Sequence, residues 1–275
     1  MPELPEIENL ARQMAQELRG KTIIELDVTQ PRCLNLSVRK FRRIVGKTVE
    51  KTSARGKWLF TRLYPNDNLL VNLGMGGDLL YHRSNETLPK KYQLRLTFHD
   101  STELTATFSW FGYVHIAPDK ELLNHKMTSR LGMSPLDKEF TAEKLVSLLS
   151  GRRGAIKNFL LNQKDIAGIG NVYVQDILFK ARLHPQRQIQ TLTESEIKAL
   201  HRSAREVLNL SIELGGLKYE RDLYGRYGRF GPEHYLVAYK TGEPCPTCKT
   251  TITKIKTGST ASYICPKCQR ARQAS

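Results

Sequence analysis

Four cysteines near the end of the chain constrain its fold more than any other feature. They occur as Cys245-x2-Cys248 and Cys265-x2-Cys268, with sixteen residues between the two pairs. This spacing is typical of two tight turns that place four thiolates around one tetrahedral zinc ion. Four thiolates close the coordination shell, so we predict one structural zinc ion in a zinc finger at 241–275. Disulfides are the weaker interpretation in a protein predicted to be intracellular. The fifth cysteine, Cys33, is predicted to be a buried apolar residue.

The charge balance indicates a polyanionic partner. Lys and Arg number 43 against 27 Asp and Glu, a formal charge of +16. Nucleic acid is favoured over a membrane surface, because no basic amphipathic helix with an aromatic face is found; a generally basic, solvated surface is the alternative. No apolar run approaches the roughly 20 residues that span a bilayer, and Glu3 and Glu6 stand where a signal peptide carries positive charge. We therefore expect a cytoplasmic, nucleoid-associated protein without a secretion or membrane signal.

The first six residues, 1–6, allow two interpretations. Removal of Met1 would leave Pro2 with a free secondary amine, which titrates near 7.7–8.0 and can attack an electrophilic sugar carbon. Glu3 beside it could donate or accept a proton. The alternative is an ordinary helix start, with Pro5 at the first helical position and an apolar face over 7–18. A helix over 5–18 is expected in either case, but it leaves Pro2 and Glu3 unexplained.

Periodicity divides the rest of the chain into an N-terminal β part and a helical part. Short alternating runs separated by turns predict strands, which favours a β-sandwich or barrel over about 1–120. The predicted strands lie at 22–29, within 47–63, and at 68–73, 94–98 and 103–108. From 141 the period becomes helical, with helices near 145–149, 155–161 and 172–181 and a capping box at Thr193-x-x-Glu196. The predicted fold class is α+β multidomain: a β-sandwich with a flanking helix (1–120), a helical domain (121–240) with a loop at 217–231, and the zinc finger (241–275).

A glycine-rich turn at 168–171 interrupts the helical part. Such a turn exposes backbone N–H groups, and with the following helix N-terminus it can hold phosphate. Basic residues precede it, among them Arg152, Arg153 and Lys157. An ordinary interhelical turn is the alternative, but the basic neighbours and the basic zinc finger favour phosphate.

Six motifs in order make the chain similar to the formamidopyrimidine-DNA glycosylase / endonuclease VIII family over essentially its whole length. They are 2–6, 55–57, 73–75, 111–112, 167–173 and the four-cysteine finger. The resemblance implies a β-sandwich, a helix–two-turn–helix domain and a zinc finger. It also implies double-stranded DNA containing a damaged base or abasic site as the partner of a monomeric enzyme.

The resemblance assigns roles residue by residue. It makes Pro2 the amine that attacks C1′ of a flipped nucleotide, Glu3 the acid that assists ring opening, and Lys57 a phosphate contact that assists elimination. Met75 and Phe111 would fill the gap left by the flipped base, which offsets lost stacking; core packing is the alternative for these two. The resemblance makes Asn171 a phosphate contact, Lys157 is also predicted to hold phosphate, and Lys91 and Arg153 are further predicted DNA-binding residues.

The chain departs from the family pattern at several of these places. Ser109 and Trp110 stand where a basic pair often precedes the wedge phenylalanine, and Asn72 replaces a histidine. Thr260 takes the place of a fingertip arginine, for which Lys254, Lys256 or the 270–272 tail are substitutes to consider. These changes bear on the second elimination and on the preferred opposite base, and the lesion class is left open.

The resulting hypothesis is a bifunctional DNA glycosylase and abasic-site lyase that excises damaged, oxidised bases through a Pro2 imine and β-elimination, with δ-elimination less favoured. A non-catalytic protein that binds damaged DNA is the alternative. The loss of the fingertip arginine motivates it, and the intact Pro2, Glu3 and Lys57 argue against it.

Overall fold

The computed structural model describes residues 1–271. Two compact units share the chain: residues 1–130 with 214–229, and residues 131–213 with the chain from 230 onward. The loop at 214–229 therefore packs with the first unit, and the finger packs with the helical unit. The predicted domain boundaries at 120 and 240 do not coincide with the borders of these compact units, and the three-domain division stays a prediction about function.

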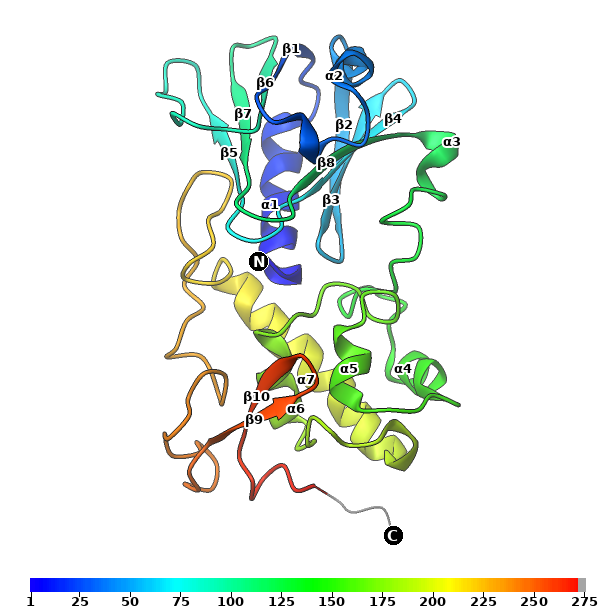
Figure 1. The fold of residues 1–275 in the computed structure, drawn as a ribbon, viewed down its shortest axis with the longest axis vertical. Coiled ribbons are helices and arrows are strands. Elements are labelled where there is room, and N and C mark those ends of the chain that lie inside the picture. The colour runs from blue at the N-terminus through cyan, green and yellow to red at the C-terminus, as the bar shows by residue number, and fades with distance from the viewer. Residues whose placement is uncertain (272–275) are drawn as a thin grey trace. The chain divides into compact units, whose positions relative to one another are not determined.

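The first unit is a sandwich of two four-stranded antiparallel sheets (Figure 1). One sheet has the order β1-β6-β7-β5, built from Ile23–Val28, Leu94–Phe98, Glu103–Thr107 and Asp78–His82. The other has the order β2-β3-β4-β8, built from Thr48–Arg55, Trp58–Tyr64, Asp67–Asn72 and Tyr113–Pro118. Apolar residues alternate along β6 (Leu94, Leu96 and Phe98), so one face of the strand enters the core between the sheets.

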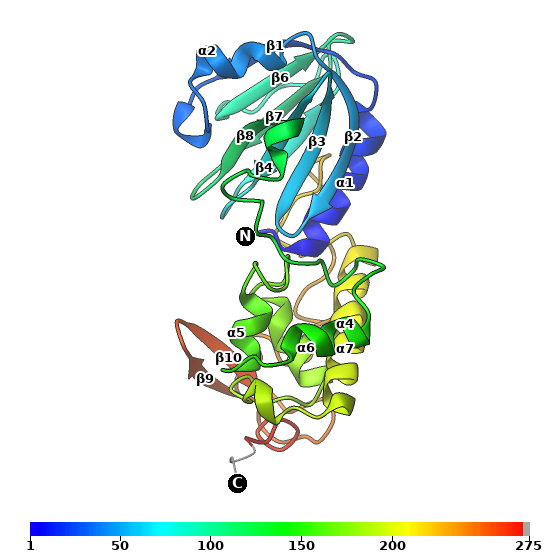
Figure 2. The ribbon, with the colours of Figure 1, turned by 90° about the vertical axis from the view of Figure 1, so that its right-hand side faces the viewer.

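Helix α1 (Leu4–Leu18) covers this core from one side (Figure 2). Its buried stripe includes Ile7, Leu10 and Met14, at the helical spacing of three and four residues. The helix begins with a capping box in which Glu3 is the N-cap and Glu6 accepts a hydrogen bond from the Glu3 amide at 2.8 Å. Glu3 thus has a structural role that the sequence left unexplained.

Short helical segments connect the strands of this unit. Helix α2 (Val38–Phe41) lies between β1 and β2, flanked by 3-10 turns at Pro31–Cys33 and Arg42–Ile44, and helix α3 (Asp119–Leu122) follows β8. Cys33 is buried in the core, as predicted.

The second unit contains helices that pack on one another and a β-hairpin that packs against α6 (Figure 2). The helices are α4 (Ala142–Leu149), α5 (Ile156–Leu161), α6 (Tyr173–Lys180) and α7 (Glu194–Glu213), and a 3-10 turn at Ile189–Thr191 precedes α7. The predicted capping box opens α7: the Glu196 amide donates to Thr193 Oγ1, and the Thr193 amide donates to Glu196 Oε2. The hairpin consists of β9 (Thr253–Thr257) and β10 (Thr260–Ile264).

The predicted α+β class, sandwich and finger are confirmed, but four strands, β5, β8, β9 and β10, went unpredicted. β5 has five residues and follows directly on a glycine turn, and β8 carries buried His115 and ends at Pro118, so neither shows a clear apolar alternation. The finger hairpin has mostly polar strands: β9 reads TKIKT and is largely exposed, and only the end of β10, at Tyr263 and Ile264, is apolar and buried. Among residues 1–271, no helix combines the length and apolar character needed to cross a bilayer.

Candidate functional site

The chain terminus meets a buried carboxylate within the first unit. The Met1 amino nitrogen lies 3.1 Å from Glu220 Oε1, and the Glu220 side chain is 8% exposed. Burial raises the pKa of Glu220, while the charged terminus lowers it and Glu3 raises it again. Removal of Met1 would transfer the terminal charge to buried Pro2, beside the N-cap Glu3.

Sequence reasoning had assigned no role to Glu220, because it is distant in sequence from the terminus that it contacts. Its loop is held in place by helix α1: Glu6 Oε1 accepts from the Leu217 amide at 3.1 Å. Gly216 is required there, because its φ is +91° and an added Cβ would lie 3.1 Å from the Glu6 side chain. The first turn of α1 thus positions both the terminus and the loop that faces it.

Lys57 lies in the two-residue turn between β2 and β3. Gly56 precedes it with φ +59°, the conformation that the first position of a tight hairpin turn requires. The Lys57 ammonium is 4.0 Å from Met1 Sδ, so the lysine faces the terminus. Asn72 braces the turn by donating from Nδ2 to the Lys57 carbonyl at 2.8 Å and accepting at Oδ1 from the Gly74 amide at 3.0 Å. The asparagine therefore joins the Lys57 turn to the next glycine loop.

Two clamped loops expose three large apolar side chains. Met75, Trp110 and Phe111 are 41%, 66% and 66% exposed. The Met75 and Trp110 backbones exchange hydrogen bonds at 2.8 and 3.2 Å, and an added Cβ on Gly74 would lie 2.0 Å from the Trp110 carbonyl oxygen. Core packing is excluded for Met75 and Phe111, and Trp110 joins them as a third exposed residue that the sequence had marked only as a departure.

Asn171 stands at the end of the glycine turn, in the second unit. Gln163 holds that turn by accepting from the Gly168 amide and donating to the Ile169 carbonyl, both at 2.8 Å. Gln175 donates to Asn171 Oδ1 at 3.1 Å. Among the described residues nothing accepts from the Asn171 amide nitrogen, so that donor is available to an anion.

Lys157 differs from the prediction that it contacts phosphate directly. The residue is 1% exposed, and its ammonium donates to four oxygens of the finger hairpin. Burial lowers the pKa of Lys157 to about 8. The side chain therefore fastens α5 to the hairpin instead of extending into solvent.

The remaining predicted DNA-binding residues are exposed. Lys91 lies in the segment between β5 and β6, and Arg153 lies just before α5. The neighbouring Arg152 forms an ion pair with Asp165 at 2.8 Å, which leaves Arg153 as the more available cation. Within the tail at 270–272, Arg270 is exposed and Arg272 lies outside the described residues.

Asp176, in the first turn of α6, has a structural role. Its carboxylate accepts from the amides of Leu236, Val237 and Ala238 at 2.9–3.0 Å. Burial raises the pKa of Asp176, and the three amides act in the opposite direction. The residue fixes the chain that leads into the finger.

The four predicted zinc ligands converge. The Sγ atoms of Cys245, Cys248, Cys265 and Cys268 all lie within 4.8 Å of one another. The measured separations of 3.4 and 3.9 Å bracket the roughly 3.8 Å expected between thiolates bound to one tetrahedral zinc ion, and they are far longer than a disulfide bond. The residues fit one structural zinc ion, and four thiolates leave no open position for catalysis.

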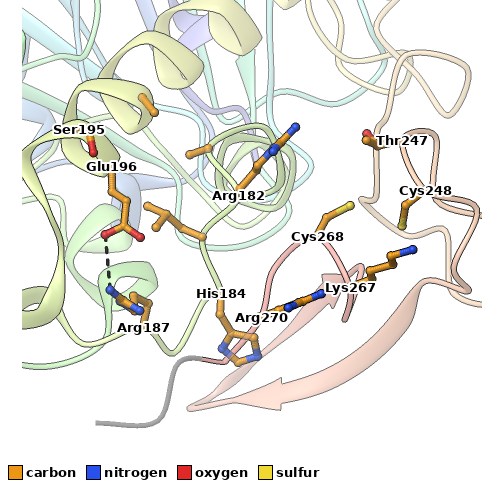
Figure 3. A pocket seen from close by; sticks show the side chains of 13 residues that line it. Arg182, His184, Arg187, Ser195, Glu196, Thr247, Cys248, Lys267, Cys268 and Arg270 are labelled. Carbon is orange, nitrogen blue, oxygen red and sulfur yellow. Dashed lines mark hydrogen bonds and ion pairs between the residues drawn. The ribbon is translucent and has the colours of Figure 1, made fainter. Parts of the chain in front are cut away.

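Basic side chains surround a cavity of about 540 Å³ beside this cluster (Figure 3). Arg182, His184, Lys267 and Arg270 line it together with Cys248 and Cys268. Arg187 also lines it and pairs with Glu196 at 3.4 Å. Because one zinc ion with four thiolates would carry a net charge of about −2, the cations Arg182, Lys267 and Arg270 are suited to offset the charge of the metal centre. The cavity thus belongs to the zinc site.

Three family profiles match the chain in order. The profile of the formamidopyrimidine-DNA glycosylase N-terminal domain matches residues 1–108. That of the formamidopyrimidine-DNA glycosylase H2TH domain matches 131–221, and that of the zinc finger found in FPG and IleRS matches 242–271.

Individual relatives match over nearly the whole chain. A formamidopyrimidine-DNA glycosylase of Chloroflexus aurantiacus is 36% identical, with 99% of each chain covered. One of Bacillus cereus is 34% identical, covering 98% of this chain and 99% of its own. A solved Lactococcus lactis Fpg in complex with DNA containing an abasic site has a TM-score of 0.89 at 29% identity, covering 98% of this chain and all of its own. A Lactococcus lactis complex with DNA containing Fapy-dG has a TM-score of 0.88 at 30% identity over the same shares.

Proposed function

Because the chain belongs to the formamidopyrimidine-DNA glycosylase family, we propose that it is a bifunctional DNA glycosylase and abasic-site lyase of base-excision repair. Its substrate is double-stranded DNA with a damaged, oxidised base or an abasic site, in keeping with the DNA held by its solved relatives. The observation that carries the proposal is the convergence of the chain terminus, Glu3 and Lys57 within one unit.

The reaction begins at the terminal amine. Removal of Met1 gives Pro2 a secondary amine, of which a useful share is uncharged near neutral pH. This amine attacks C1′ of the damaged nucleotide, the base departs, and an iminium ion forms. Glu3 donates a proton to the sugar oxygen as the ring opens. Glu3 is the N-cap of α1 and directly follows Pro2 in the chain, which supports this role.

Elimination follows from the iminium ion. Loss of a proton from C2′ allows the 3′ phosphate to leave, and a nearby cation stabilises that leaving group. Lys57 supplies this cation from its rigid turn beside the terminus. Glycosylase and lyase chemistry therefore use one amine and one lysine of the first unit.

The remaining proposed residues hold and distort the duplex. Met75 and Phe111, with Trp110 beside them, fill the gap left by the flipped nucleotide. Asn171, Arg153 and Lys91 contact the phosphate backbone, which positions the protein without reading sequence. The protein acts as a cytoplasmic, nucleoid-associated monomer, with functional domains at 1–120, 121–240 and 241–275.

Borohydride reduction tests this proposal against the alternative of a non-catalytic binder. An enzyme that forms an imine becomes covalently attached to an abasic duplex when borohydride is present, and it cleaves that duplex when borohydride is absent. A binder shifts the same duplex in a gel but yields neither adduct nor cleavage. A panel of duplexes with oxidised purines or oxidised pyrimidines, assayed in parallel, identifies the lesion class.

A further inference from the structure

Lys157 is a buried charge without a counter-charge. It is the second residue of α5, where the partial positive charge of a helix N-terminus disfavours a cation. Buried charges are ordinarily paired, yet no carboxylate of the described residues lies within ion-pair distance of this ammonium. Burial alone lowers the pKa of Lys157, to about 8. At neutral pH the ammonium is therefore still largely protonated. An unneutralised positive charge is therefore held inside the protein.

This charge lies directly beneath the tip of the finger hairpin. Lys157 Nζ donates to Thr257 Oγ1 at 3.1 Å, Thr260 Oγ1 at 3.0 Å, the Ala261 carbonyl at 2.6 Å and Ser262 Oγ at 2.9 Å. All four acceptors are neutral and belong to the hairpin. The turn between the strands, Gly258 and Ser259, is exposed. The ammonium is thus separated from the surface of the tip by one layer of hydroxyl and carbonyl groups.

Thr260 connects the buried charge with the surface. It is half-buried, and its oxygen accepts from Lys157 while its proton makes only a 3.4 Å contact with the Thr257 carbonyl. A bound anion offers that proton a better acceptor. An anion on Thr260 would then lie one hydrogen bond beyond the ammonium, in a protein environment where charges interact more strongly than in water.

The same network reaches Asn171. Gln175 donates to the Ala261 carbonyl at 3.2 Å, the oxygen that also accepts from Lys157. Gln175 further donates to Asn171 Oδ1 and accepts from the Tyr263 amide. The hairpin tip and the glycine turn are therefore held together by one hydrogen-bonded network.

We propose that Lys157 is a positioning residue whose buried ammonium gives the hairpin tip its affinity for a DNA phosphate, bound at the Thr260 hydroxyl. The charge that other family members present on a surface arginine is here supplied from below the surface. This inference rests on the proposed function, since it takes damaged DNA as the ligand. It replaces the direct phosphate contact predicted for Lys157 with an indirect one. It also assigns a phosphate-binding role to Thr260, which stands in the place of the family's fingertip arginine.

A pH titration of DNA affinity tests the proposal. The probe is a duplex with a tetrahydrofuran abasic analogue, which binds without reacting. Phosphate binding stabilises the protonated lysine, so its pKa rises in the complex. The affinity should be constant below pH 8 and should fall above it, by at most about tenfold per pH unit. Lys157→Met should bind about tenfold more weakly at pH 7, show no such fall, and have a salt slope lower by about one.

Two further variants separate charge from packing. In the Lys157→Met background, Thr260→Arg should restore affinity at pH 7 and leave it independent of pH up to 9.5. Thr260→Val keeps the lysine in place and should lose the pH-dependent part of the affinity. The matched control is Lys256→Met, on the exposed side of β9, which should weaken binding but retain the fall above pH 8.

The outcomes that overturn the inference are specific. They are an unchanged pH profile in Thr260→Val, or a Lys157→Met protein that keeps its zinc and still binds like the wild type. Failure of Thr260→Arg to restore affinity, with zinc content unchanged, would make Lys157 a packing residue only. If Lys157→Met does not fold, Thr260→Val alone decides the question. The proposed function fails separately, if the wild type forms no borohydride adduct on an abasic duplex.

Discussion

The two units place their key cations in opposite ways. In the first unit, Lys57 stands in a tight turn, partly exposed, beside the chain terminus with which we propose that it acts. In the second unit, Lys157 is fully buried, and its four partners lie 100 to 105 residues further along the chain. A reacting lysine must reach its substrate, whereas a lysine that only attracts a phosphate can act through an intervening hydroxyl.

The two placements separate a charge that must touch the reacting atoms from a charge that acts at a distance. Proton transfer and leaving-group stabilisation require contact, which agrees with the proposed roles of Pro2, Glu3 and Lys57 near the terminus. Electrostatic attraction acts over several ångströms in a low-dielectric environment, so the charge behind Thr260 does not require exposure.

Blocking the terminal amine should abolish the chemistry of the first unit. A protein with an uncleaved N-terminal extension should give no borohydride adduct on abasic DNA, because no free amine remains. Pro2→Gly should retain weak activity, since it exposes a poorer, primary amine. DNA binding by the second unit serves as the control and should be unaffected. Full adduct formation by the extended protein would assign the nucleophile to a lysine and contradict the role proposed for the terminal amine.

Removal of a zinc ligand should damage the second unit and spare the first. Cys265→Ser leaves three thiolates, so zinc content should fall well below one per chain, and DNA affinity should drop by roughly tenfold to a hundredfold. The sandwich shares no ligand with the metal and should stay folded, as hydrogen exchange of its strands would report. Ser262→Ala, on the same hairpin, is a control that should keep its zinc. Freshly purified wild type without zinc would contradict the site.

Truncation of the exposed aromatic residues should slow excision of a paired lesion more than cleavage at an abasic site. Phe111→Ala and Trp110→Ala remove stacking worth about 1–3 kcal/mol per base, so excision should fall by roughly tenfold or more. An abasic site has already lost its base, so its cleavage depends less on stacking by Phe111 and Trp110. Phe60→Ala, on a partly buried strand position, controls for general loss of stability. Equal effects on both substrates would indicate a folding role for the two loops.

The smallest predicted effect concerns the end product. Thr260 is neutral, and the Lys157 charge lies beneath it, so we expect β product to accumulate and δ product to form slowly. Thr260→Arg brings a cation to the surface and should raise the δ fraction a few-fold on a denaturing gel of end-labelled abasic duplex. Lys254→Arg changes no charge and should leave the fraction unaltered. A wild type that passes directly to δ product would show that Thr260 does not limit the second elimination.

Sequence alone predicted the features that are local. The four cysteines, the capping box at Thr193 and Glu196, and six of the eight sandwich strands could be predicted, because each depends on a short spacing of residue types. The N-terminal motif also lies within six residues, so its chemistry could be proposed before any fold was known.

Long-range arrangements could not be predicted in this way. No spacing rule indicates that Glu220 faces the terminus, that Lys157 lies under Thr260, or that Asn72 braces the Lys57 turn. Lys157 resembled a surface phosphate contact because lysines are rarely buried without a carboxylate. Trp110 appeared as a departure from a basic pair, and its exposure became evident only from the paired backbones of the two loops.

Peptide mapping of the borohydride adduct tests the central claim most directly. Wild-type protein is reduced on an abasic duplex, the DNA is digested to the sugar remnant, and the modified peptide is identified by mass spectrometry. We predict that the remnant lies on the nitrogen of Pro2, at the start of a chain that has lost Met1, and that Lys57 is unmodified. An adduct on Lys57, or on any other lysine, would contradict the proposal that the terminal amine is the nucleophile.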